Sequence, residues 1–209
     1  TRFLRQFFVL FSNFHYISIS EYVLYPGPDF TLVAEFLKCY TVYACNSNLS
    51  EKKGTKHMST LTCGFIGLGL IGGSIAKAIR QYYPAWKILA FDKNKETLAL
   101  AVQEGTIHTS CSSIDEHFRD CAYIFLCAPI SYNTAYLSQL KEYLGPDCIL
   151  TDVGSVKTSI HEEVTTLGLE EYFIGGHPMA GSEKSGFINA KAHLIENAYY
   201  ILTPSAMVS

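Results

Sequence analysis

The sequence predicts an α/β domain with a doubly wound, mostly parallel sheet that begins near Met58. From Leu61 onward, short apolar segments alternate with helical ones, which is the pattern of parallel strands joined by helices on both faces of a sheet. The first apolar segment runs directly into a glycine-rich turn at residues 67–73, and a helical segment follows. This order of strand, glycine turn and helix is typical of a Rossmann-type fold.

The individual elements are bounded by proline and glycine. The expected strands are rich in Ile, Leu, Phe and Tyr and lie at residues 61–67, 87–92, 121–128, 148–153, 172–174 and 199–202. Helices are expected at residues 71–82, 95–103, 131–144 and 156–167. Pro84, Gly105 and Gly145 follow the first three helices, and Ser131 is placed to cap the third.

Residues 1–57 differ in character from the rest. They hold twelve of the chain's Phe and Tyr residues and show no sustained helical or strand period. We interpret them as an irregular N-terminal extension, with residues 58–209 as the folded domain. One hypothesis is that the extension is translated upstream DNA, because Glu51-Lys52-Lys53-Gly54 would have purine-rich codons where a bacterial ribosome-binding site lies before Met58. A genuine extension is the alternative.

Composition excludes several classes of protein. The net charge is −3 with no basic stripe, which gives no reason to expect nucleic acid as a partner. No apolar run reaches the length of about 18 residues that a membrane helix needs, and no signal-peptide cleavage site follows the N-terminal apolar run. The seven cysteines are odd in number and form no C-x-x-C pair, which favours reduced, buried thiols in a cytoplasmic protein.

The glycine-rich turn has the spacing G-x-G-x-x-G. Gly67 permits the tight turn, Gly69 lets the backbone approach a pyrophosphate, and Gly72 lets the helix pack close to the strand. Leu70 and Ile71 begin the helix, whose free N–H groups and positive dipole end favour phosphate. The turn therefore predicts a dinucleotide-binding site.

A second group of residues indicates which dinucleotide binds. Asp92 lies at the end of the second strand, 20 residues after Gly72, where a carboxylate accepts hydrogen bonds from the adenosine ribose and disfavours a 2′-phosphate. We therefore expect NAD rather than NADP, although the nearby Lys93 and Lys95 leave the choice open. Ala128 and Pro129 end another strand and are expected to border the cofactor.

A histidine at a later strand end is the candidate catalytic base. His177 lies between Gly176 and Pro178, where small neighbours let a flat ligand come close. Imidazole titrates near neutral pH, so it can accept a proton from an alcohol while hydride leaves the same carbon. Ser155 is expected to orient this imidazole by a hydrogen bond. No Cys or His grouping has metal-ligand spacing, and we expect no metal.

At these residues the sequence resembles a known family. Asp-Val-Gly-Ser-Val-Lys at 152–157 and Gly-Gly-His-Pro-Met-Ala-Gly-Ser-Glu-Lys-Ser-Gly at 175–186 are similar to segments of prephenate dehydrogenase and its arogenate-using relatives. By that resemblance, His177 is the catalytic histidine that hydrogen-bonds the ring hydroxyl of prephenate, and Ser155 assists it. Ser182, Glu183 and Lys184 match the segment that lines or gates the substrate pocket.

The resemblance implies an NAD-dependent oxidoreductase of tyrosine biosynthesis. The reaction would be the oxidative decarboxylation of prephenate to 4-hydroxyphenylpyruvate. Family members continue into a C-terminal helical domain that supplies cationic substrate ligands and forms a homodimer. We expect that residues 58–209 do not include that domain and that a homodimer forms only when the domain is present. Arogenate as the substrate, another Rossmann-type dehydrogenase and a non-catalytic NAD-binding fragment are the alternatives.

Overall fold

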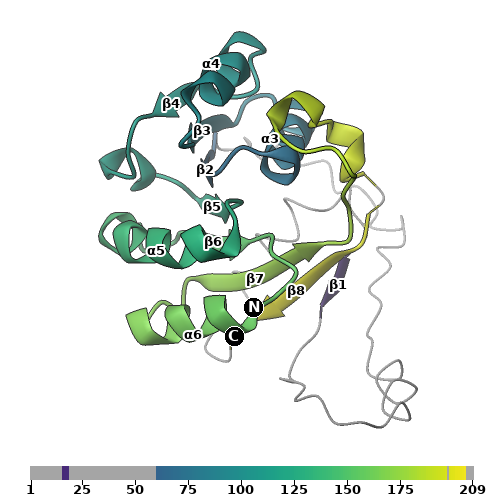
Figure 1. Cartoon of the computed structure of the whole chain (residues 1–209). Helices are drawn as coiled ribbons and strands as arrows, with labels where there is room; N and C mark the ends of the chain where they lie inside the picture. Colours follow the sequence, from purple (N-terminus) through teal and green to yellow (C-terminus); the bar gives the residue numbers. More distant parts are fainter. Residues whose placement is uncertain (1–15, 19–59, 197, 206–209) are drawn as a thin grey trace, which may run out of the picture.

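The computed structural model describes residues 16–18, 60–196 and 198–205 of the chain. Eight strands form one sheet in the order β1-β8-β7-β6-β5-β2-β3-β4 (Figure 1). Strands β2 to β7 run parallel, whereas β8 is antiparallel to β7. The predicted doubly wound, mostly parallel sheet is therefore confirmed. Its strands are β1 (Tyr16–Ser18), β2 (Thr62–Ile66), β3 (Lys87–Phe91), β4 (Thr109–Cys111), β5 (Tyr123–Leu126), β6 (Ile149–Asp152), β7 (Phe173–Pro178) and β8 (Tyr200–Pro204).

Helices cover both faces of the sheet (Figure 1). On one face, buried side chains such as Phe65, Ile88 and Phe125 pack under the helices that follow β2 and β3. On the other face, Ile66, Leu150 and their neighbours pack under the helices that follow β5 and β6. The helices are α3 (Leu70–Tyr82), α4 (Lys95–Gln103), α5 (Ile130–Leu140) and α6 (Thr158–Leu167), with 3-10 turns η1 (Glu116–Phe118), η2 (Lys141–Tyr143), η3 (Phe187–Asn189) and η4 (Ala192–Leu194).

Several element boundaries differ from the sequence predictions, among them those of α5 and α6. Helix α5 begins at Ile130 with Pro129 at its N-cap position and without a side-chain cap, so the predicted cap at Ser131 was wrong. It ends at Leu140, and the predicted continuation to Leu144 is instead the tighter turn η2. Helix α6 begins at Thr158 rather than Val156, because residues 153–157 form the loop that leaves β6.

Pairing extends β7 beyond its predicted end. The strand was expected to stop at Ile174, but its antiparallel ladder with β8 continues to Pro178. His177 therefore lies inside a paired strand, opposite Ile201, rather than in a loop. Strand β4 was not predicted, because two of its three residues are exposed and it carries no apolar run.

Strand β1 lies within the segment interpreted as irregular. It pairs in parallel with β8 through Tyr16↔Tyr200 and the two residues that follow. The proposed domain boundary at residue 58 falls outside the described residues and stays a prediction, as does the upstream-DNA hypothesis.

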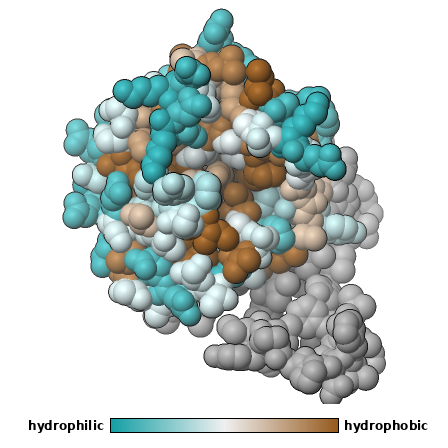
Figure 2. Space-filling model, viewed as in Figure 1, coloured by the Kyte–Doolittle hydropathy of each residue, from teal (hydrophilic) through white to brown (hydrophobic). Residues whose placement is uncertain are grey.

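The described ranges of the chain contain no helix that could span a membrane and no disulfide bond. No helix there is long and apolar enough to cross a membrane, and hydrophobic surface forms several patches among hydrophilic side chains (Figure 2). Five cysteines belong to these ranges; none forms a disulfide and all but the half-buried Cys127 are buried. Cys39 and Cys45 lie outside the described residues.

Candidate active site

The glycine turn lies next to the end of β5, at the point where the strand order of the sheet reverses. The chain moves from β2 outward to β4 and then returns to β5 on the other side of β2, which creates the crevice where such sheets bind ligands. Gly67 has a φ of +90°, and a Cβ there would lie 2.6 Å from the Ala128 backbone nitrogen. Only glycine fits this position, because any side chain would enter the backbone of the neighbouring strand end.

The other two glycines of the motif have opposite surroundings. A Cβ at Gly72 would lie 2.6 Å from the Gly67 carbonyl oxygen and 2.8 Å from the Cys127 Cβ, so Gly72 permits close packing of helix on strand. A Cβ at Gly69 would have no neighbouring atom within 4 Å. Gly69 is the N-cap of α3 and offers no side-chain cap to the first turn. The backbone around Gly69 is thus open, next to N–H groups without intrahelical partners, and fits a pyrophosphate.

Asp92 connects the end of β3 to the glycine turn. Its Oδ2 accepts a hydrogen bond of 2.7 Å from the Leu68 N–H, and its Oδ1 accepts one of 2.8 Å from the Asn94 N–H. The carboxylate is half-buried and fixed beside the turn that would hold the phosphates. A ribose placed there would meet an anionic acceptor.

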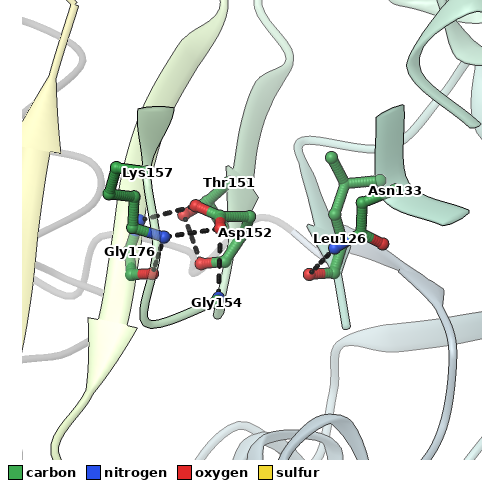
Figure 3. Close-up of polar contacts among 7 residues, drawn as sticks. All are labelled: Leu126, Asn133, Thr151, Asp152, Gly154, Lys157 and Gly176. Atoms are coloured by element: carbon green, nitrogen blue, oxygen red, sulfur yellow. Dashed lines mark hydrogen bonds and ion pairs between the residues drawn. The ribbon is translucent and has the colours of Figure 1, made fainter. Parts of the chain in front are cut away.

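A buried ion pair lies at the ends of β6 and β7 (Figure 3). The Asp152 carboxylate, whose side chain is 1% exposed, accepts a hydrogen bond of 2.5 Å from Lys157 Nζ. It also accepts hydrogen bonds from the N–H groups of Gly154 (3.0 Å) and Gly176 (3.1 Å). Lys157 Nζ donates a second hydrogen bond of 2.6 Å to the Gly176 carbonyl. The pair therefore holds both backbone polar groups of the residue that precedes His177.

Gly176 has no room for a side chain. A Cβ there would lie 2.5 Å from the Asp152 carbonyl oxygen and 2.7 Å from the Tyr200 hydroxyl. The glycine before His177 thus lets β7 lie directly against the end of β6. The same contact fixes the backbone that carries the imidazole.

The imidazole of His177 is kept neutral by its surroundings. Partial burial lowers its pKa below the usual value, the Lys157 ammonium lowers the pKa further, and Asp152 opposes the shift. A neutral imidazole near pH 7 has a free nitrogen lone pair and can accept a proton.

The remaining predicted site residues are exposed, except for the half-buried Ala128. Ser155 is exposed, and the hydrogen bonds found within residues 60–205 include none between Ser155 and His177. Ser182, Glu183 and Lys184 are exposed in the loop after β7, where Ser182 Oγ accepts a hydrogen bond of 3.1 Å from the Lys184 N–H. Ala128 is half-buried against Gly67 and Pro129 is exposed beside it.

Sequence reasoning assigned no role to Asp152 or Lys157. The sequence did contain a signal for an ion pair. Asp152 ends a buried strand, and Lys157 follows five residues later, on the other side of a single turn. Within the described part of the chain, no group of three or more His, Cys, Asp or Glu side chains is arranged to hold a metal ion.

The chain is similar to known proteins in sequence and in structure. The family model described as "Prephenate dehydrogenase, nucleotide-binding domain" matches residues 75–208. The prephenate dehydrogenase of Bacillus subtilis is 39% identical over 140 residues, which is 66% of this chain. The chain spans only 38% of that relative's length.

Two solved structures are also similar. The arogenate dehydrogenase of Synechocystis is 34% identical with a TM-score of 0.66, over 71% of this chain and 52% of that one. The prephenate dehydrogenase of A. aeolicus, in complex with hydroxyphenyl propionate and NAD+, is 32% identical with a TM-score of 0.68. That match covers 74% of this chain and 54% of the other.

Proposed function

Because this chain belongs to the prephenate dehydrogenase family through the family's nucleotide-binding domain, we propose that it binds NAD+ and serves the oxidative decarboxylation of prephenate to 4-hydroxyphenylpyruvate. The observation that carries the proposal is the placement of His177 beside a buried ion pair, on the same sheet edge as the glycine turn. Parallel strands β2, β3, β5, β6 and β7 all end at that edge.

The cofactor would be held by residues around the crevice. The open backbone at Gly69 and the first turn of α3, with Leu70 and Ile71, fit the pyrophosphate. The Asp92 carboxylate fits the ribose hydroxyls of NAD. The wall of the crevice would be completed by Gly67 and Gly72 of the glycine motif and by Ala128 and Pro129, which follow β5. When bound, NAD+ supplies the acceptor for a hydride.

His177 would remove the proton. As hydride leaves the hydroxyl-bearing ring carbon, the neutral imidazole accepts the hydroxyl proton. The carbonyl that forms at that carbon then accepts the electron pair of the carbon–carboxylate bond through the ring as the ring carboxylate leaves as carbon dioxide. The ring becomes aromatic, and the phenolate oxygen takes up a proton to give the phenol. Ser155 would assist the imidazole in the substrate-bound enzyme. The Asp152–Lys157 pair positions the strand. Partial burial and the Lys157 ammonium lower the pKa of His177 and so keep the imidazole in its basic form.

The substrate side would be completed by other groups. We assign Ser182, Glu183 and Lys184 to the loop that covers the substrate, because they follow His177 on the same strand connection. Met179 and Tyr199, at the end of the β7–β8 ladder, are more than half exposed. We propose that the helical domain implied by the family resemblance covers this apolar surface and forms the homodimer.

The test is turnover by the full gene product. With NAD+ and prephenate, we expect NADH and 4-hydroxyphenylpyruvate in equal amounts, detected by absorbance and mass spectrometry. Arogenate is the parallel substrate, since a similar structure is an arogenate dehydrogenase, and its product would be tyrosine. NAD+ binding without turnover of either compound would contradict the catalytic proposal and leave a binding module.

A further inference from the structure

Two side-chain contacts join the end of β3 to the first turns of α5. The ring of Phe91 meets the ring of Tyr136 edge-on, with centroids 5.6 Å apart. Two residues further along, Lys93 Nζ lies 3.8 Å from the centroid of the Tyr132 ring. Tyr132 and Tyr136 are one helical turn apart and so share a face of α5. The side chain of Lys93 is therefore directed across to the helix.

The residue between these contacts is the proposed ribose ligand. The Asp92 carboxylate accepts hydrogen bonds from the N–H groups of Leu68 and Asn94. Within residues 60–205, the ion pairs found do not include one between Lys93 and Asp92. The Lys93 ammonium is thus held on an aromatic face, away from the carboxylate next to it in sequence.

We propose that Tyr132 is a determinant of cofactor specificity, because it holds the Lys93 ammonium away from the ribose position and so preserves discrimination against NADP. The inference rests on the proposed function, which places the adenosine ribose at Asp92. A 2′-phosphate there would meet the repulsion of Asp92. A free lysine at position 93, on its flexible four-carbon stem, would offset that repulsion by pairing with either the phosphate or Asp92.

The energetic scale of the contact sets the expected effect. Lys93 and Tyr132 are both exposed. An exposed cation–π contact raises the population of the conformer in which the ammonium lies on the ring by a factor of about two to five over the conformers without the contact. Replacing the ring by an aliphatic side chain, Tyr132→Leu, should therefore raise the affinity for NADP+ relative to NAD+ about twofold to fivefold. Tyr132→Phe keeps an aromatic face for the ammonium and should leave the ratio near that of the parent.

The experiment is calorimetric titration of the chain and its variants with NAD+ and with NADP+. Lys93→Gln in the parent should change the affinity ratio little, because Lys93 is already held away. In the Lys93→Gln background, Tyr132→Leu should no longer raise the ratio, since the ammonium that it would release is gone. Circular dichroism confirms that each variant is folded.

Three results would overturn the inference. An unchanged ratio in Tyr132→Leu shows that the ring does not restrain Lys93, and a gain that persists without Lys93 shows that another group is responsible. A large change on Lys93→Gln alone shows that the lysine already acts on the cofactor in the parent, and this measurement tests the inference even when Tyr132→Leu fails to fold. Failure of the parent to bind either cofactor is a separate result, which overturns the proposed function and this inference with it.

Discussion

Lys157 Nζ lies 2.5 Å from the Asp152 carboxylate while it also donates to the Gly176 carbonyl at 2.6 Å. The two residues thus connect the loop after β6 to the strand that carries His177. Burial lowers the pKa of Lys157, and the attraction of Asp152 opposes that shift. The Asp152 side chain that faces the ammonium is itself almost fully buried, with 1% of it exposed.

Removing one member of this pair should be costly. Lys157→Met leaves a buried carboxylate without its cation, and breaking such a pair typically costs about 3–5 kcal/mol. The double variant Asp152→Asn, Lys157→Met removes both charges and should recover part of that free energy of unfolding. Urea denaturation followed by circular dichroism measures both. If the double variant is no more stable than Lys157→Met, the unpaired charge of Asp152 is not the cause of the lost free energy of unfolding.

The second and third glycines of the motif should show different effects on stability and on cofactor binding. Gly72→Ala places a Cβ 2.6 Å from the Gly67 carbonyl oxygen, an overpacking that should cost about 1–3 kcal/mol of stability. Gly69→Ala meets open space and should fold as the parent does, but the methyl group would stand where the pyrophosphate approaches. Thermal unfolding and NAD+ titration of both variants check this. Normal NAD+ affinity in Gly69→Ala would refute the assigned phosphate position.

Asp92 should set the preference for NAD+ over NADP+. Asp92→Ala should narrow the difference in affinity between the two cofactors, because the charge that repels a 2′-phosphate is gone. The matched control is Asp92→Asn, which keeps an acceptor for the Leu68 N–H and removes only the charge. In calorimetric titrations, both variants should show a smaller difference between the affinities for NAD+ and NADP+. Equal affinities of the parent for the two cofactors would contradict the assignment of Asp92 to the ribose.

The pH dependence of turnover should reflect the lowered pKa of His177. Burial and the Lys157 cation both favour the neutral imidazole, so the base is present above its pKa and lost as the pH falls through it. The acid limb of kcat/KM should therefore lie below about pH 6.5, the ordinary value for histidine. In Lys157→Met the limb should move to higher pH, because the Lys157 cation no longer lowers the pKa of His177 while Asp152 still raises it. A limb that stays in place would argue that Lys157 does not act on His177.

The fold could largely be predicted because its signals are local. Alternating apolar segments and the glycine turn depend on residues close in sequence, and helix α4 was predicted with its observed bounds, Lys95–Gln103. The Asp152–Lys157–Gly176 cluster could not be predicted in the same way, because it depends on how closely β7 approaches β6. The extension of β7 through His177 likewise depends on pairing with β8, about 25 residues later in the chain.

The substitution His177→Asn in the full gene product tests most directly whether His177 is the general base. Asparagine can donate a hydrogen bond but cannot accept the hydroxyl proton, so kcat should fall by about 10²–10⁴-fold while NAD+ affinity stays near that of the parent. Ser155→Ala is the matched comparison and should cost less, because it leaves the base in place. The His177→Asn variant should also lack the acid limb of the parent's pH profile. Turnover of prephenate by His177→Asn at nearly the parent rate would contradict the assignment of His177 as the base.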